Sequence, residues 1–73
     1  MKFKFTNHAK YRMDTRGLST LDIKDIINHP DFTEVQNNGK ILKVKYILNK
    51  GEIAVVYRLL GNEFIVITVY YEN

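Results

Sequence analysis

The sequence predicts an α+β domain in which two N-terminal helices pack on one face of an antiparallel meander of three or four strands. Before Pro30, apolar residues recur at helical spacing. After Pro30, apolar and polar residues alternate in short runs that are separated by turns rich in Asn and Gly. A run of helices followed by a run of strands indicates a layered α+β domain.

Size and composition limit the classes of protein that the chain can belong to. Its 73 residues predict a single domain over residues 1–73, and 45% apolar residues are typical of a globular chain. The absence of cysteine excludes disulfides and thiolate metal sites. No signal peptide or membrane-length apolar run occurs, which predicts a cytoplasmic location without membrane contact. The net charge of +3 permits an anionic partner such as nucleic acid or an acidic protein, but the charge alone favours a lysine-rich surface that only aids solubility.

The N-terminal segment predicts a strand followed by a helix. Residues 2–5 alternate Lys and Phe, which indicates a short strand or an extended arm. Thr6 or Asn7 is the expected N-cap of a helix that runs to about Arg16, and Gly17 suits its left-handed end. Residues spaced four apart share one face of a helix, so a polar stripe is expected at His8, Arg12 and Arg16 beside an apolar stripe at Ala9 and Met13.

The second helix is predicted to begin after Ser19 and to end before Pro30. Asp22 lies three residues after Ser19, as in a capping box. The apolar face of this helix is formed by Ile23, Ile26 and Ile27. Pro30 disfavours helical geometry in the residue before it, so the helix stops near His29.

The remaining chain predicts strands over residues 32–36, 41–48, 52–60 and 63–71. A three-residue loop at 49–51 would pair Leu48 with Glu52, and a two-residue turn at 61–62 would pair Leu60 with Glu63. One sheet face, expected under the helices, would then hold Leu42, Val44, Tyr46, Ala54, Val56, Arg58, Ile65, Ile67 and Val69. The other face would hold Lys43, Lys45, Ile53, Val55, Tyr57, Phe64, Val66, Thr68 and Tyr70. A one-residue bulge in either hairpin would move the last strand between these faces.

Few motifs carry recognisable chemistry. The chain has no phosphate-binding glycine loop, paired carboxylates, serine nucleophile motif or metal-binding spacing, so no cofactor or metal is expected. Metal-free RNA cleavage requires only a base, an acid and cations beside the phosphate, which His and Arg can supply. Structural alternatives stay open: His8 could cap or pack, Arg12 and Arg16 could form ion pairs, and Arg58 could extend from the strand end into water.

A family resemblance then follows from the motifs. His8-Ala9, Arg12-Met13, Arg16-Gly17-Leu18-Ser19, Pro30, Arg58 and Ile67-Thr68-Val69-Tyr70 resemble a family of small prokaryotic domains of unknown function with a His-Ala-x-x-Arg-x-x-x-Arg-Gly signature. That family is similar to the RelE- and BrnT-type toxins of toxin–antitoxin pairs. The resemblance covers roughly residues 5 to 71 and implies a RelE-like or barnase-like toxin fold.

The resemblance also implies a metal-independent endoribonuclease that cleaves mRNA, including ribosome-bound mRNA, and that binds an antitoxin protein. The implied catalytic residues are His8, Arg12, Arg58 and Tyr70, with Thr68 among the family's proposed active residues and Arg16 as support. Lys43 and Lys45 would bind backbone phosphates, and Tyr57 or Tyr70 would stack on bases. The alternative is a non-catalytic relative that binds protein or nucleic acid as an accessory, immunity or regulatory module. The predicted register separates Arg58 from Thr68, so one shared site requires a different register or a sheet edge.

Overall fold

The computed structural model describes residues 2–72 of the chain. Its elements in chain order are β1 (Lys2–Phe5), α1 (Asn7–Arg16), α2 (Thr20–Asn28), β2 (Phe32–Val35), the short 3₁₀ helix η1 (Asn37–Gly39), β3 (Ile41–Ile47), β4 (Gly51–Leu60) and β5 (Glu63–Tyr71). The predicted α+β class and both predicted helices are confirmed.

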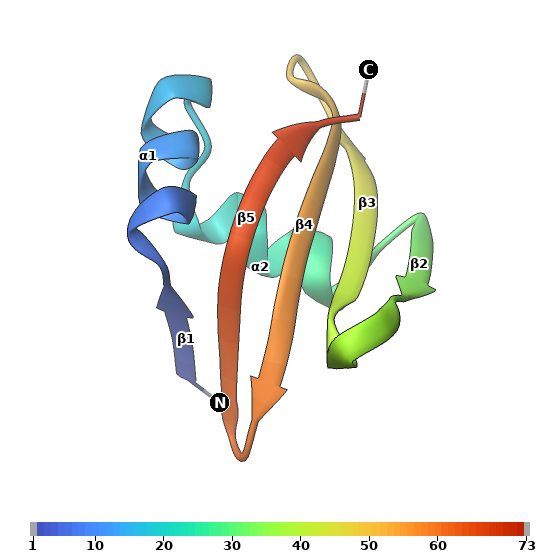
Figure 1. The fold of residues 1–73 in the computed structure, drawn as a ribbon. Coiled ribbons are helices and arrows are strands. Elements are labelled where there is room, and N and C mark those ends of the chain that lie inside the picture. Colours follow the sequence, from blue (N-terminus) through green and yellow to red (C-terminus); the bar gives the residue numbers. More distant parts are fainter. Residues whose placement is uncertain (1, 73) are drawn as a thin grey trace.

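The sheet differs from the expected antiparallel meander of three or four strands. The described residues form a five-stranded mixed sheet with the strand order β1-β5-β4-β3-β2 (Figure 1). The first strand lies parallel to the last, with Phe3 opposite Phe64 and Phe5 opposite Val66. Parallel strands need a long crossover connection, and here nearly the whole chain provides it. No local turn signal marks such a pairing, so the alternation of residues 2–5 could not reveal its partner.

Both helices begin at side-chain caps. Thr6 is the N-cap of α1, and its hydroxyl accepts a hydrogen bond from the Ala9 backbone N–H at 3.1 Å. The predicted capping box of α2 is confirmed, because Ser19 and Asp22 bond each other's backbone N–H. Gly17 ends α1 in the left-handed region at φ 66°. These caps satisfy backbone donors that a helix start leaves unpaired.

The helices cover the opposite sheet face from the one predicted. Ala9, Met13 and the three isoleucines of α2 pack on Ile53, Val55, Tyr57, Val66 and Val69, a surface that we call the helix face. In Figure 1, α2 passes behind β4 and β5, and α1 stands beside β5. The other surface, which we call the open face, carries a second apolar cluster of Leu42, Val44, Ala54 and Val56.

Two lysines of β3 explain why the helices cover a different sheet face from the one predicted. Lys43 Nζ donates a hydrogen bond to the Ile27 carbonyl at 2.8 Å, and Lys45 Nζ donates one to the His29 carbonyl at 3.0 Å. Their aliphatic stems therefore lie on the helix face while their ammonium groups bind the C-terminal carbonyls of α2. In the sequence, these lysines instead indicated a face turned toward water.

The β4–β5 hairpin contains a bulge that reverses half of β5. The predicted turn is confirmed, because Leu60 pairs with Glu63 and Arg58 with Ile65. The predicted pairing of Val56 with Ile67 is wrong: the register shifts between Val56 and Tyr57, so Val56 faces Thr68 and Tyr57 faces Val66. Ile67 is the extra residue, and the shift directs Val69 into the core.

The β3–β4 hairpin also differs in register but keeps its faces. Ile47 pairs with Gly51 instead of Leu48 with Glu52, so Val44 lies opposite Ala54. The partner of each β3 residue therefore moves by two residues along β4. Because side chains along a strand alternate with a period of two, each new partner points to the same face as the predicted one. Which residues of β3 and β4 share a face is therefore as predicted.

Candidate functional site

The bulge at Ile67 brings Thr68 and Tyr70 to the open face, on which Arg58 also lies. Arg58 lies opposite Ile65, Val56 lies opposite Thr68, and Ala54 lies opposite Tyr70. Arg58, Thr68 and Tyr70 therefore follow one another along the β4–β5 pair. Arg58 and Tyr70 are four residues of strand apart, about 13 Å between their backbone positions. The predicted separation of Arg58 from Thr68 is wrong, because the bulge reverses the last half of β5.

Arg58 has an unsatisfied donor. Its Nε atom is buried and has no hydrogen-bond partner among residues 2–72. Buried polar atoms in folded proteins are nearly always paired, and leaving a donor unpaired costs about 1–3 kcal/mol. Because Nε is shielded from solvent, an oxyanion can accept its N–H only after the side chain moves. The side chain as a whole is only half-buried, so a ligand on the open face can reach the guanidinium group.

Tyr70 lies in a mixed apolar and acidic environment. It packs against the apolar cluster of the open face. Burial raises the pKa of the phenol above its ordinary value of 10.0, and the negative charges of Glu72 and Glu34 raise it further. Tyr70 therefore keeps its proton well above neutral pH. A hydroxyl in this state can donate a hydrogen bond or a proton but cannot act as a base.

Glu34 is a site neighbour that the sequence analysis did not identify. It lies on β2 opposite Leu42, so it shares the open face with Tyr70. Its charge acts on Tyr70 although the two residues are on strands at opposite sides of the β3–β4 hairpin. The alternation of Phe32 and Glu34 placed both on one face, but the sequence did not show which face of the sheet that was.

α1 stands at the β5 edge and carries the His8/Arg12 side of the predicted site. Thr6 N donates to the Val66 carbonyl at 3.0 Å, and the Thr6 hydroxyl donates to the Ile67 carbonyl at 2.8 Å. The helix therefore begins directly at the bulge. His8 is exposed and Arg12 is half-buried. On the surface of α1, His8 and Arg12 lie on one side of the buried stripe that Ala9 and Met13 form. Lys10 and Asp14 lie on the other side of that stripe.

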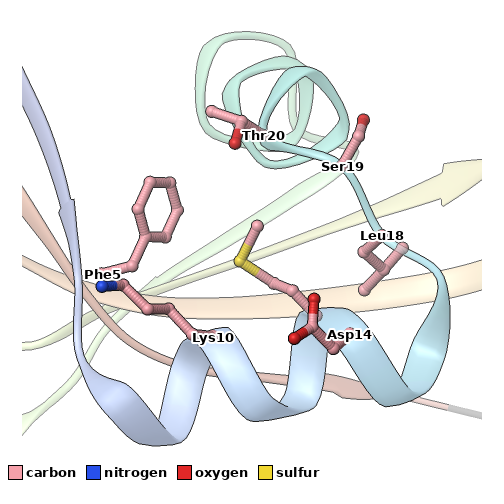
Figure 2. A pocket seen from close by; sticks show the side chains of 7 residues that line it. Phe5, Lys10, Asp14, Leu18, Ser19 and Thr20 are labelled. Atoms are coloured by element: carbon pink, nitrogen blue, oxygen red, sulfur yellow. The ribbon is translucent and has the colours of Figure 1, made fainter.

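The Lys10/Asp14 flank faces α2 across a pocket. This cavity of about 360 Å³ is lined by Phe5, Lys10, Met13, Asp14, Leu18, Ser19 and Thr20. Figure 2 shows it between α1 and the start of α2, with Phe5 reaching toward it from β1. None of the predicted site residues lines it. His8 and Arg12 therefore point away from α2, toward the β5 side of α1.

Arg16 serves a structural contact at the other end of α1. Its guanidinium carbon lies 5.0 Å from the centre of the Tyr71 ring, and the Tyr71 hydroxyl donates to the Arg16 carbonyl at 3.2 Å. Tyr71 packs against the core under the helices. These contacts fasten the end of α1 to β5.

Three other predicted binding residues belong to the helix face. Lys43 and Lys45 hold the C-terminal carbonyls of α2, as described above. Tyr57 is only 2% exposed and packs edge-on against Phe64. The Tyr57 ring is therefore not available to stack on a base. The predicted register places these three residues on the same face as Thr68 and Tyr70. The bulge at Ile67 moves Thr68 and Tyr70 to the opposite face.

The fold and the site together define a small α+β domain with a mixed sheet, whose open face gathers a guanidinium group, hydroxyl groups and a carboxylate. Residues 5–71 match the family described as Domain of unknown function (DUF4258), and the chain belongs to this family. A comparison with curated proteins finds no matching relative. No helix in the part of the chain that the structure describes is long and apolar enough to cross a bilayer.

Proposed function

We propose that the protein is a toxin-like, metal-independent endoribonuclease that cleaves single-stranded RNA on the open face. The observation that carries this proposal is the half-buried guanidinium group of Arg58, which has an unpaired Nε and shares the open face with Thr68 and Tyr70. The guanidinium plane suits phosphate because it donates two hydrogen bonds at once.

The proposed reaction is attack of the ribose 2′-oxygen on the adjacent phosphorus. His8 removes the proton of the 2′-hydroxyl, the new O2′–P bond forms, and the P–O5′ bond breaks. Arg12 and Arg58 stabilise the charge that develops on the phosphorane oxygens. Tyr70, which stays protonated at neutral pH, donates its proton to the leaving 5′-oxygen. The products are a 2′,3′-cyclic phosphate and a 5′-hydroxyl, and solvent returns the protons to their starting groups.

Purified protein should cleave RNA in the presence of a chelator, either alone or with ribosomes. His8→Ala should lower the rate by about 10²-fold or more, because a general base is lost. Arg58→Ala should have a similar effect, because the phosphate loses a charged donor. Cleavage is measured on end-labelled RNA, with a 2′-deoxy substitution at the cut position as a blocked substrate.

His29→Ala is the matched control, because the exposed His29 lies at the end of α2 and outside the open face. It should leave the cleavage rate unchanged. Full activity in His8→Ala would contradict the role of His8. No cleavage by the wild-type protein under either condition would overturn the proposed activity itself.

A second candidate function, binding of another protein without catalysis, is favoured by β2. This strand forms one edge of the sheet, and all four of its residues are exposed. Exposed edge strands readily accept a strand from a partner, as an antitoxin or an accessory protein could provide. Light scattering of the protein mixed with an acidic protein encoded beside it would show a complex, and Val35→Lys should weaken that complex without changing RNA cleavage.

A further inference from the structure

Two aromatic side chains on the open face have no role in the core. Phe32 is 54% exposed and Tyr46 is 55% exposed, whereas Tyr57 and Phe64 pack within the helix-face core. Phe32 lies directly opposite Val44, and Tyr46 follows Val44 by two residues on the same strand. The two rings are therefore diagonal neighbours that both border the buried Val44, on the sheet face that bears Arg58 and Tyr70.

The charges of the open face differ from one side to the other. Toward β5 and β1 it presents the guanidinium group of Arg58 and the ammonium group of Lys4, the latter paired with Glu63. Toward β2 it presents the Glu34 carboxylate, two residues from Phe32 on the same strand and opposite Leu42, whereas Tyr46 lies beyond Phe32 on the other side. A carboxylate repels phosphate but accepts hydrogen bonds from amino groups on a base. The β2 side therefore suits a base, and the Arg58 side suits the backbone.

We propose that Phe32, Tyr46 and Glu34 form a subsite for two adjacent unpaired bases of single-stranded RNA, with a preference for an exocyclic amino group on the base at Phe32. Each ring stacks on one base, and Glu34 accepts a hydrogen bond from the amino group of the base on Phe32. This inference rests on the proposed function, because it assigns the substrate's bases to one end of the same face. Arg58 and Phe32 are two strands and four residues apart, about 16 Å, which a short oligonucleotide spans.

The test is binding of short oligonucleotides that carry 2′-O-methyl groups, because these cannot be cleaved by 2′-hydroxyl attack. Phe32→Ala and Tyr46→Ala should each weaken binding about tenfold, since a stacked base is lost. The slope of log affinity against log salt should stay unchanged in both, because that slope counts phosphate contacts. Arg58→Ala should reduce the slope by about one.

Ring-retaining variants and an unrelated apolar position serve as controls. Phe32→Tyr and Tyr46→Phe should keep wild-type affinity, because the stacking surface remains. Leu48→Ala should also keep it, since the exposed Leu48 lies in the β3–β4 loop. Oligo(C) should bind more tightly than oligo(U), because only cytosine offers an amino group to Glu34. Glu34→Gln should remove that preference.

The outcomes separate this inference from the proposed function. If Arg58→Ala weakens binding while the two alanine variants at the rings do not, the base subsite is wrong and the phosphate site stands. If the wild-type protein binds no oligonucleotide but cleaves RNA with ribosomes, the base subsite is wrong and the proposed function stands; if it neither binds nor cleaves, the proposed function fails. If the ring variants change only the sedimentation mass of the protein, the rings form a protein interface and the base subsite is overturned.

Discussion

Tyr70 keeps its proton because the bulge places it on the open face, against apolar side chains and within the field of two carboxylates. The folded state favours the neutral phenol, whereas in the unfolded chain it ionises near pH 10. The neutral Tyr70 side chain therefore makes its full contribution to stability below about pH 10. That contribution is lost as the pH rises toward the higher pKa of Tyr70 in the folded state. This titration reports directly on the surroundings of the candidate site.

Glu34→Gln should lower the pKa of Tyr70 toward its ordinary value, because one of the neighbouring negative charges is removed. The ultraviolet absorbance of tyrosinate measures the change, and Tyr70→Phe identifies which step of the titration belongs to Tyr70. Glu63→Gln is the control, since the Glu63 side chain pairs with Lys4 at the end of β5. An unchanged Tyr70 midpoint in Glu34→Gln would show that the two groups do not interact.

A second titrating residue, Asp22, concerns stability rather than the site. The hydrogen bond from Lys50 Nζ at 2.7 Å lowers the pKa of Asp22 below 3.8, and the Ser19 backbone N–H lowers it further. A carboxylate whose pKa is lower in the folded state stabilises the fold at pH values above its unfolded-state pKa. That stabilisation is lost as the pH falls through the folded-state pKa. Asp22→Asn should cost about 1 kcal/mol near neutral pH and should remove part of the loss of stability below about pH 4.

Urea denaturation near neutral pH and near pH 3 measures the effect of Asp22→Asn. Asp25→Asn, which changes an exposed carboxylate on the same helix, should preserve the wild-type dependence on pH. If both variants lose stability equally on acidification, the ion pair and the capping box contribute nothing to that dependence.

At the scale of elements, Thr6 connects α1 to the bulge. Its hydroxyl accepts from Ala9 N–H and donates to the Ile67 carbonyl, so one atom caps the helix and satisfies the bulged strand. Thr6→Val should therefore lower the free energy of unfolding by about 1–3 kcal/mol. Thr6→Ser keeps both hydrogen bonds and should lose little. Equal losses in the two variants, measured by urea denaturation, would contradict this role of the hydroxyl.

The contact of β3 with the end of α2 gives a prediction about Lys43 and Lys45. Because both ammonium groups bind carbonyls of α2, Lys43→Met and Lys45→Met should each cost about 0.3–1 kcal/mol of stability. They should leave the salt dependence of RNA binding unchanged. A decrease of about one in the salt slope for either variant would show that the lysine contacts phosphate, as the sequence analysis predicted.

At the scale of the whole molecule, the sequence predicted features that neighbouring residues determine. The caps at Thr6 and Ser19, the end of α1 at Gly17 and the turn at Gly61-Asn62 all follow from residues close in the chain. The pairing of β1 with β5 and the bulge at Ile67 do not, because they depend on contacts between distant segments. Arg58, Thr68 and Tyr70 became candidates through the family resemblance, but only the structure placed them on one face.

The parallel pairing of β1 with β5 also sets an order of events during synthesis. The first strand and the Thr6 anchor have their partners in residues 63–67, near the end of the sequence. A growing chain can form α2 and the β3–β4 hairpin early, but β1 and α1 wait for β5. Closing so large a loop is slow compared with forming local contacts. Under the proposed function, the site that needs both α1 and β5 can therefore assemble only after translation has passed β5.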